Sequence, residues 1–201
     1  MEQVLMYGMP VWGFLALFFF YGDAAVTPQA MVKEFGLLSL SLLCITFIIG
    51  PLSFLFSPVF NHLKVYRKYL GLSGFFAGVI HVSLVLFYYY HLNFSIFFDI
   101  QNPRYLSIFL GVLGLLILCI ISISSIDHIK GFLGYGKWKA IQTTGYLALL
   151  AIMEHFILIE TKNGVFAIKK PLGQVIFLFG FLVILVRFVV FLLVEFRRKE
   201  T

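Results

Sequence analysis

Two histidines, His81 and His155, lie inside apolar stretches long enough to cross a membrane. The other three, His62, His91 and His128, fall in or beside the polar connections, where a solvated ring needs no special role. Ionisable side chains within a bilayer are rare and commonly functional. Two neutral imidazoles that face each other from neighbouring helices can hold a haem iron. Axial ligation of a haem iron is therefore the chemistry that these two residues suggest.

The two histidines are expected at similar depths in the membrane. His81 follows Tyr69, where its stretch begins, by 12 residues, and His155 follows Ala140 by 15. At 1.5 Å per residue these spacings correspond to roughly 18 and 22 Å along parallel helices. Both rings then fall in the outer half of the bilayer. Small and aromatic residues, which suit a flat apolar ligand, surround them: Gly71, Gly74, Gly78, Phe75, Phe76, Phe87 and Phe156.

Spacing alone leaves other uses of the two histidines open. Membrane helices also use histidine for hydrogen bonds between helices. A zinc or copper site would need further ligands at this depth, and Glu154 is the one candidate nearby, about 100° round the helix from His155. A small transporter that moves protons or metal ions through His81, Glu154 and His155 is the alternative function. Such a transporter should have more polar residues along its path than these stretches contain. A lipid-embedded scaffold without a cofactor is a third reading.

The composition is that of a membrane protein. Hydrophobic residues make up 61% of the 201 residues and charged residues 12%, and the mean hydropathy is +1.01. Soluble domains are about half apolar and one-quarter charged. We predict an all-α integral membrane protein, a single transmembrane domain over residues 1–201 with six helices. The predicted spans are residues 4–21, 35–60, 69–90, 105–124, 140–159 and 173–194.

The basic residues lie mostly between the spans, which indicates membrane topology rather than nucleic-acid binding. Nine Lys and Arg residues fall in the connections 61–68 and 125–139 and in the tail, and five fall in the other connections. The positive-inside rule then places both termini in the cytoplasm. Pro51 predicts a kink in the second span, and Arg187 is expected to snorkel to the inner interface. The sequence shows no internal repeat.

Two segments resemble the third and fifth spans of ferric reductase-like transmembrane proteins. The first is Arg67-Lys68-Tyr69-Leu70-Gly71-Leu72-Ser73-Gly74-Phe75-Phe76-Ala77-Gly78-Val79-Ile80-His81, and the second begins Trp138-Lys139-Ala140-Ile141-Gln142-Thr143-Thr144-Gly145-Tyr146-Leu147 and continues to His155. STEAP-type metalloreductases and MsrQ-type haem subunits share this layout. The resemblance covers about residues 36–193. The segment ending at His81 is its most specific part.

The resemblance implies that His81 and His155 are the axial ligands of one haem b, and that the chain passes electrons across the bilayer. It implies an electron-transfer subunit, not a complete enzyme, and no catalytic residue is expected. Two-haem members carry a further histidine about 13 residues before each ligand. The corresponding places here are near Arg67 and at Gln142. One haem in the outer half of the membrane is therefore expected.

The electrons are expected to come from outside the chain. STEAP-type proteins carry a nicotinamide-binding domain and NADPH oxidases a flavin domain, and neither is visible in this sequence. The donor is expected to be a separate flavoprotein, a bound FMN or FAD, or a membrane quinol, with Arg67 and Gln142 as candidate contacts at the inner face. An acceptor on the outer side, membrane lipid and a second copy of the chain are the other expected partners.

Overall fold

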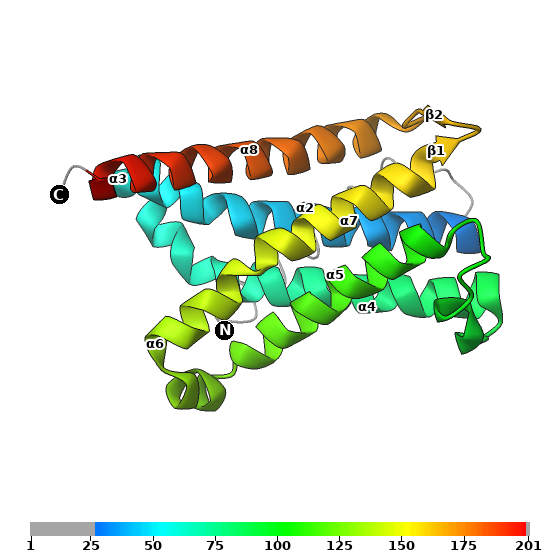
Figure 1. Ribbon diagram of the computed structural model, residues 1–201, viewed down its shortest axis with the longest axis horizontal. Coiled ribbons are helices and arrows are strands. Elements are labelled where there is room, and N and C mark those ends of the chain that lie inside the picture. Colours follow the sequence, from blue (N-terminus) through cyan, green and yellow to red (C-terminus); the bar gives the residue numbers. More distant parts are fainter. Residues whose placement is uncertain (1–26, 200–201) are drawn as a thin grey trace.

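A computed structural model of the chain describes residues 27–199, which form a bundle of helices that run side by side (Figure 1). Its long helices are α2 (Pro28–Leu55), α4 (Arg67–Tyr90), α5 (Tyr105–Ser124), α7 (Gly145–Glu160) and α8 (Pro171–Lys199). In the described part of the chain, five helical stretches are long and apolar enough to cross a membrane. The span expected at residues 4–21 lies outside the described residues.

Short elements join the long helices at two opposite ends of the bundle (Figure 1). One end, here the α6 end, holds α3 (Ser57–Phe60), η1 (Asn61–Tyr66) and α6 (Asp127–Thr143). The other, here the hairpin end, holds η2 (Phe94–Phe97) and the strands β1 (Thr161–Lys162) and β2 (Val165–Phe166). The two strands are antiparallel, with Thr161 opposite Phe166. Asn163 and Gly164 between them have φ of 51° and 78°, as a tight hairpin turn requires.

Helix α2 forms the centre of the bundle, where it packs against α4, α7 and α8. It is apolar around its whole circumference, as expected for a helix that neighbours cover on several sides. Its residues Leu40, Leu43 and Cys44 are almost completely buried. The rest of the core comes from α5, α7 and α8, with Leu118, Ala148, Leu149, Met153, Ile176 and Val183.

Helix α2 starts earlier than predicted, at Pro28 instead of residue 35, and ends at Leu55 instead of residue 60. The hydroxyl of Thr27 accepts a hydrogen bond from the backbone N–H of Ala30 at 3.2 Å, and Pro28 suits the first helical turn. The helix continues through Pro51. A proline lacks the N–H that would bond to the carbonyl four residues earlier, here that of Phe47. The hydroxyl of Tyr146 donates to this carbonyl at 2.9 Å and takes the place of the missing bond.

The spans predicted at 69–90, 105–124 and 173–194 correspond closely to α4, α5 and α8. The span predicted at 140–159 is divided. Helix α6 ends at Thr143 and α7 begins at Gly145, with a break at Thr144. Much of the connection expected before residue 140 is helical in α6, which is interrupted at Gly134, where φ is 71°. Glycine reaches this backbone conformation without steric cost.

The helix pairs α2–α4 and α5–α7 make equivalent contacts. A Cβ added at Gly71 of α4 would lie 3.3 Å from Thr46 of α2. One added at Gly145 of α7 would lie 3.3 Å from Ile121 of α5, in addition to a closer contact with the ring of Phe47 of α2. Positions 46 and 121 are 75 residues apart, and positions 71 and 145 are 74 apart. The bundle therefore contains two copies of one helix-pair arrangement. The repeat is clearer in the contacts than in the residue types, since positions 71 and 145 both carry glycine whereas positions 46 and 121 carry threonine and isoleucine.

Candidate functional site

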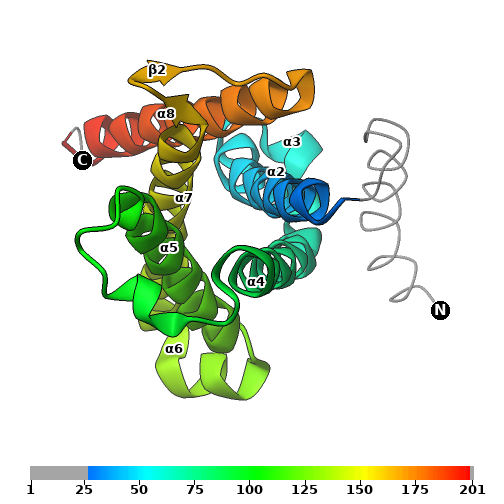
Figure 2. The same cartoon turned by 90° about the vertical axis from the view of Figure 1, so that its right-hand side faces the viewer.

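His81 of α4 and His155 of α7 face each other inside the bundle. Their ring centroids are 6.3 Å apart, and the ring planes are nearly perpendicular, at 82°. The helices around them form a closed ring in which α2 contacts α4, α4 contacts α5, α5 contacts α7, and α7 contacts α2 (Figure 2). Both histidines lie in the half of the bundle nearer the hairpin end. The structure thus brings together the two residues that the sequence singled out.

Each imidazole is fixed by a backbone carbonyl of a neighbouring helix. Nδ1 of His81 lies 2.8 Å from the carbonyl oxygen of Val32, and Nδ1 of His155 lies 2.8 Å from that of Ser107. A carbonyl oxygen can only accept, so Nδ1 carries the proton in both rings. Nε2 of each ring therefore keeps its lone pair. This is the arrangement that orients a histidine for binding a metal through Nε2.

Each imidazole also rests on a glycine one helical turn beyond that carbonyl. A Cβ at Gly36 would lie 3.0 Å from Nδ1 of His81, and one at Gly111 would lie 2.9 Å from Nδ1 of His155. Such distances are too short for a side chain to be added without movement of the ring. Gly36 and Gly111 are again 75 residues apart, so the two copies of the helix pair hold their histidines in the same way.

The ring separation fits one axially ligated metal between the two imidazoles. Two metal–nitrogen bonds of about 2 Å each, with ring radii of roughly 1.2 Å, place the centroids of such a pair about 6 Å apart. Among the described residues no group of three or more His, Cys, Asp and Glu side chains could hold a metal ion. A haem supplies its own equatorial nitrogens and needs only two axial ligands, so the pair fits a haem better than a zinc or copper ion.

The remaining titratable candidates lie away from the ring pair. The side chains of His62, His91 and His128 are exposed, as expected from their positions in the sequence. Glu154 is exposed on the outside of α7 and does not join His155 in any metal-binding group of described residues. A path for protons or metal ions through His81, Glu154 and His155 therefore gains no support from this arrangement.

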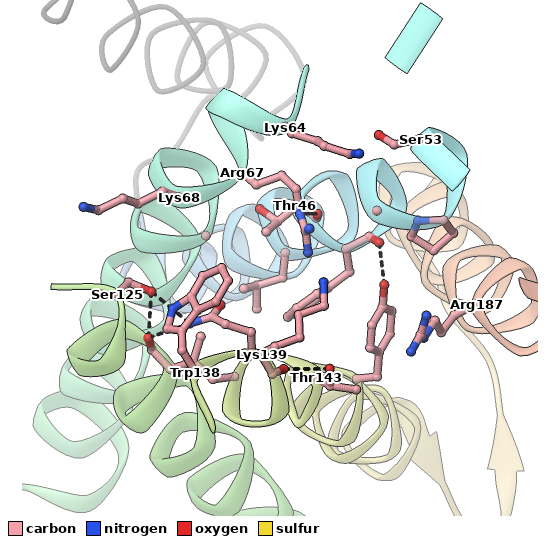
Figure 3. A pocket seen from close by; sticks show the side chains of 18 of the residues that line it. Thr46, Ser53, Lys64, Arg67, Lys68, Ser125, Trp138, Lys139, Thr143 and Arg187 are labelled. Carbon is pink, nitrogen blue, oxygen red and sulfur yellow. Dashed lines mark hydrogen bonds between the residues drawn. The ribbon is translucent and has the colours of Figure 1, made fainter. Parts of the chain in front are cut away.

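A cavity of about 940 Å³ opens at the α6 end, between α2, α4, α6, α7 and α8 (Figure 3). Arg67 and Arg187 reach it from different helices. That Arg187 also snorkels to the membrane interface stays a prediction. Asp127 is the one acidic residue among the described residues that line it, and it pairs with Lys68 at 3.1 Å. The basic residues that line it are Lys64, Arg67, Lys68, Lys130, Lys139 and Arg187.

Arg67 and Gln142 both line this cavity and occupy equivalent places in the two helix pairs. Nε of Arg67 donates to the carbonyl oxygen of Thr46 at 3.2 Å, and Nε2 of Gln142 donates to that of Ile121 at 3.3 Å. In each case the two partners are 21 residues apart. The Gln142 amide also donates to the hydroxyls of Ser124 and Ser125, both at 3.1 Å. Neither place carries an imidazole.

Tyr146 also lines the cavity, although no sequence motif marked it as a candidate site residue. Its ring lies under Arg187, whose guanidinium carbon is 5.0 Å from the ring centroid, and beside Phe47 at 5.2 Å between centroids. Its hydroxyl is held by the carbonyl of Phe47 that Pro51 leaves without a backbone partner. The proline in the second span was the available signal, because it implies that some side chain replaces the lost bond.

The chain is similar to known membrane proteins. Residues 35–153 match the model of the family described as "Ferric reductase like transmembrane component", a region that includes Arg67, His81 and Gln142 and stops two residues before His155. The chain is 33% identical over 152 residues to the protein-methionine-sulfoxide reductase heme-binding subunit MsrQ of Pasteurella multocida (strain Pm70). That match covers 73% of this chain and 70% of the relative. With its apolar helices, this is a multi-pass integral membrane protein. The chain belongs to the family of ferric reductase-like transmembrane components.

Proposed function

We propose that this chain is a haem-binding electron-transfer subunit that carries electrons across the membrane. The observation that carries the proposal is the facing pair of His81 and His155, at 6.3 Å between ring centroids and with both Nδ1 atoms held by carbonyls. The similarity to a heme-binding subunit of a protein-methionine-sulfoxide reductase supports it. The chain then serves as one subunit of an oxidoreductase, with the reaction on the acceptor completed elsewhere.

In this proposal Nε2 of His81 and Nε2 of His155 would hold the iron of the haem. A bound haem supplies a carrier that accepts and releases one electron. The carbonyls of Val32 and Ser107 keep the two rings in the ligating tautomer. The haem is of b type, since the two cysteines, Cys44 and Cys119, form no Cys-x-x-Cys-His attachment sequence.

We propose that the chain binds one haem and not two. A second haem at the α6 end would need a pair of imidazoles at the places of Arg67 and Gln142. Those side chains instead hydrogen-bond to the carbonyls of Thr46 and Ile121. A pyridine haemochrome assay on the purified protein should give one haem per chain, and its Soret band should shift on reduction with dithionite. A colourless preparation, made with haem supplied, would contradict the proposal, and two haems per chain would contradict the stoichiometry.

The cavity at the α6 end is the proposed entry point for electrons. Six basic residues and one acidic residue line it, which favours a ligand that brings negative charge. A flavin phosphate meets this condition, whereas a neutral quinol does not. We therefore place FMN or the FAD of a donor flavoprotein there, with Arg67 and Gln142 among its contacts. Arg67 lies about 21 Å along α4 from His81, since 14 residues separate them.

Replacing Arg67 tests the choice between a flavin and a quinol. Arg67→Gln should weaken FMN binding at least tenfold, because a hydrogen bond to a charged group contributes about 1.5–3 kcal/mol. Quenching of flavin fluorescence measures the affinity. Lys33→Gln, a basic residue at the hairpin end, is the matched control and should bind FMN as the unmodified chain does. If Arg67→Gln weakens binding of a quinol analogue and leaves FMN binding unchanged, the flavin assignment is wrong.

We further propose six spans, with residues 4–21 as the first and with both termini and the α6 end in the cytoplasm. The nine basic residues in two connections and the C-terminal tail support this orientation through the positive-inside rule. Electrons would then pass from a cytoplasmic donor at the α6 end to an acceptor beyond the hairpin end. The whole chain, residues 1–201, would act as a single transmembrane haem-binding domain.

A further inference from the structure

The two histidines are held in the same way except for one group. Val32 of α2 and Ser107 of α5 are equivalent, 75 residues apart, and each offers its carbonyl to one Nδ1 at 2.8 Å. Val32 adds only an apolar side chain. Ser107 adds a hydroxyl, whose oxygen lies 3.1 Å from Nδ1 of His155. His155 therefore has two oxygen atoms near its Nδ1–H where His81 has one.

The hydroxyl of Ser107 is directed at His155 and not at its own helix. The hydroxyls of Thr46, Ser53 and Ser83 donate to the carbonyl four residues earlier, as is usual for such residues inside helices. Ser107 makes both of its hydrogen bonds to His155. Its oxygen can accept from Nδ1–H, and its proton can go to the carbonyl of His155 at 3.5 Å. Ser107 is 4% exposed, so bulk water does not compete for these groups.

A second acceptor on Nδ1–H makes an imidazole a better electron donor through Nε2. Outer hydrogen bonds of this kind raise the basicity of a ligating histidine and shift the reduction potential of the metal. A more electron-donating ligand stabilises the oxidised iron. We propose that Ser107 is a positioning residue that acts through His155, making it the stronger of two unequal axial ligands and lowering the reduction potential of the haem. The inference rests on the proposed ligation by His81 and His155.

Because the two helix pairs hold their histidines in equivalent ways, the hydroxyl can be removed at one histidine and added at the other. Ser107→Ala removes the second acceptor and should raise the potential: at a fixed ambient potential, the ratio of reduced to oxidised haem should increase about threefold. For a one-electron couple, 59 mV per tenfold change makes this a rise of about 30 mV. Val32→Ser places a hydroxyl at the equivalent position next to His81 and should lower the potential. Ser83→Ala removes a hydroxyl two residues beyond His81 that bonds within α4, and should leave the potential unchanged.

Spectroelectrochemical titration of the purified haem protein measures all three potentials, and the Soret band confirms that haem is retained. If Ser107→Ala retains its haem and its reduction potential is unchanged, the inference is overturned, even if the thermal stability of the variant changes. If Ser107→Ala loses its haem, Val32→Ser decides: a lower potential supports the inference and an unchanged one overturns it. Failure of the unmodified chain to bind haem is a different result, because it contradicts the proposed function itself.

Discussion

At the scale of residues, His81 and His155 could be selected from the sequence because ionisable side chains are conspicuous within apolar stretches. Their approach to 6.3 Å follows the expectation of similar depths on parallel helices. The groups that orient them could not be selected. Val32 and Ser107 act through backbone carbonyls, which every residue possesses, and Gly36 and Gly111 act by lacking a side chain. None of these features can be recognised from the sequence alone.

The angle between the imidazole planes predicts a spectroscopic signature. Rings held at 82° by separate carbonyls cannot become parallel without losing those hydrogen bonds. A ferric haem with nearly perpendicular axial imidazoles gives a highly anisotropic low-spin EPR signal, in which one g value is unusually large. Frozen-solution EPR of the oxidised protein should show this signal. The ordinary rhombic spectrum of parallel imidazoles would contradict the observed ring orientation.

Gly111 should be needed for haem binding. In Gly111→Ala the new Cβ would meet the ring of His155 at 2.9 Å and displace it from the position facing His81. Overpacking of this kind costs about 1–3 kcal/mol, so the haem affinity should fall roughly tenfold or more. Haem titration followed at the Soret band measures the affinity. Gly131→Ala, which has nothing within 4 Å, is the control and should bind as before. Equal affinity in both variants would show that the glycine contact has no role.

At the scale of elements, apolar length was a good guide where the stretch is bounded by polar residues, as for α5, found where it was predicted at 105–124. It failed for α6, whose glycines and lysines are typical of a loop. The bounds of α2 depended on the cap at Thr27, which a hydropathy pattern does not register. The repeated helix pair could not be recognised in the sequence either. Its equivalent contacts join different residue types, Thr46 with Gly71 in one copy and Ile121 with Gly145 in the other.

The bond between Tyr146 and the carbonyl of Phe47 should stabilise α2 at Pro51. Tyr146→Phe leaves this carbonyl without the hydrogen bond from the tyrosine hydroxyl, and a buried unsatisfied group costs about 1–3 kcal/mol, so the thermal midpoint should fall. Pro51→Ala restores a backbone N–H that can take the same carbonyl. The cost of Tyr146→Phe should therefore be smaller in the Pro51→Ala background. Equal costs in the two backgrounds, measured by thermal unfolding in detergent, would refute this coupling.

At the scale of the whole molecule, two sites lie toward opposite ends of one bundle. The histidine pair is near the hairpin end, and the basic cavity is at the α6 end. The spacing of His81 and His155, and the resemblance that pointed to Arg67 and Gln142, predicted two separate sites, and the binding of a cofactor at each stays a prediction. The sequence did not predict a cavity, because Lys64, Lys139 and Arg187 come from separate elements that only the folded bundle brings together. This separation is consistent with the proposed transfer of electrons between the two ends of the bundle.

The central claim is that His81 and His155 together hold one haem, and histidine replacement tests it most directly. Haem content per chain should be measured in His81→Ala, His155→Ala and His128→Ala, each produced with haem supplied and checked for folding by its helical circular dichroism. The first two variants should lose the haem, whereas His128→Ala, which replaces an exposed histidine on α6, should retain it. Equal haem content in all three folded variants would show that His81 and His155 do not hold the haem.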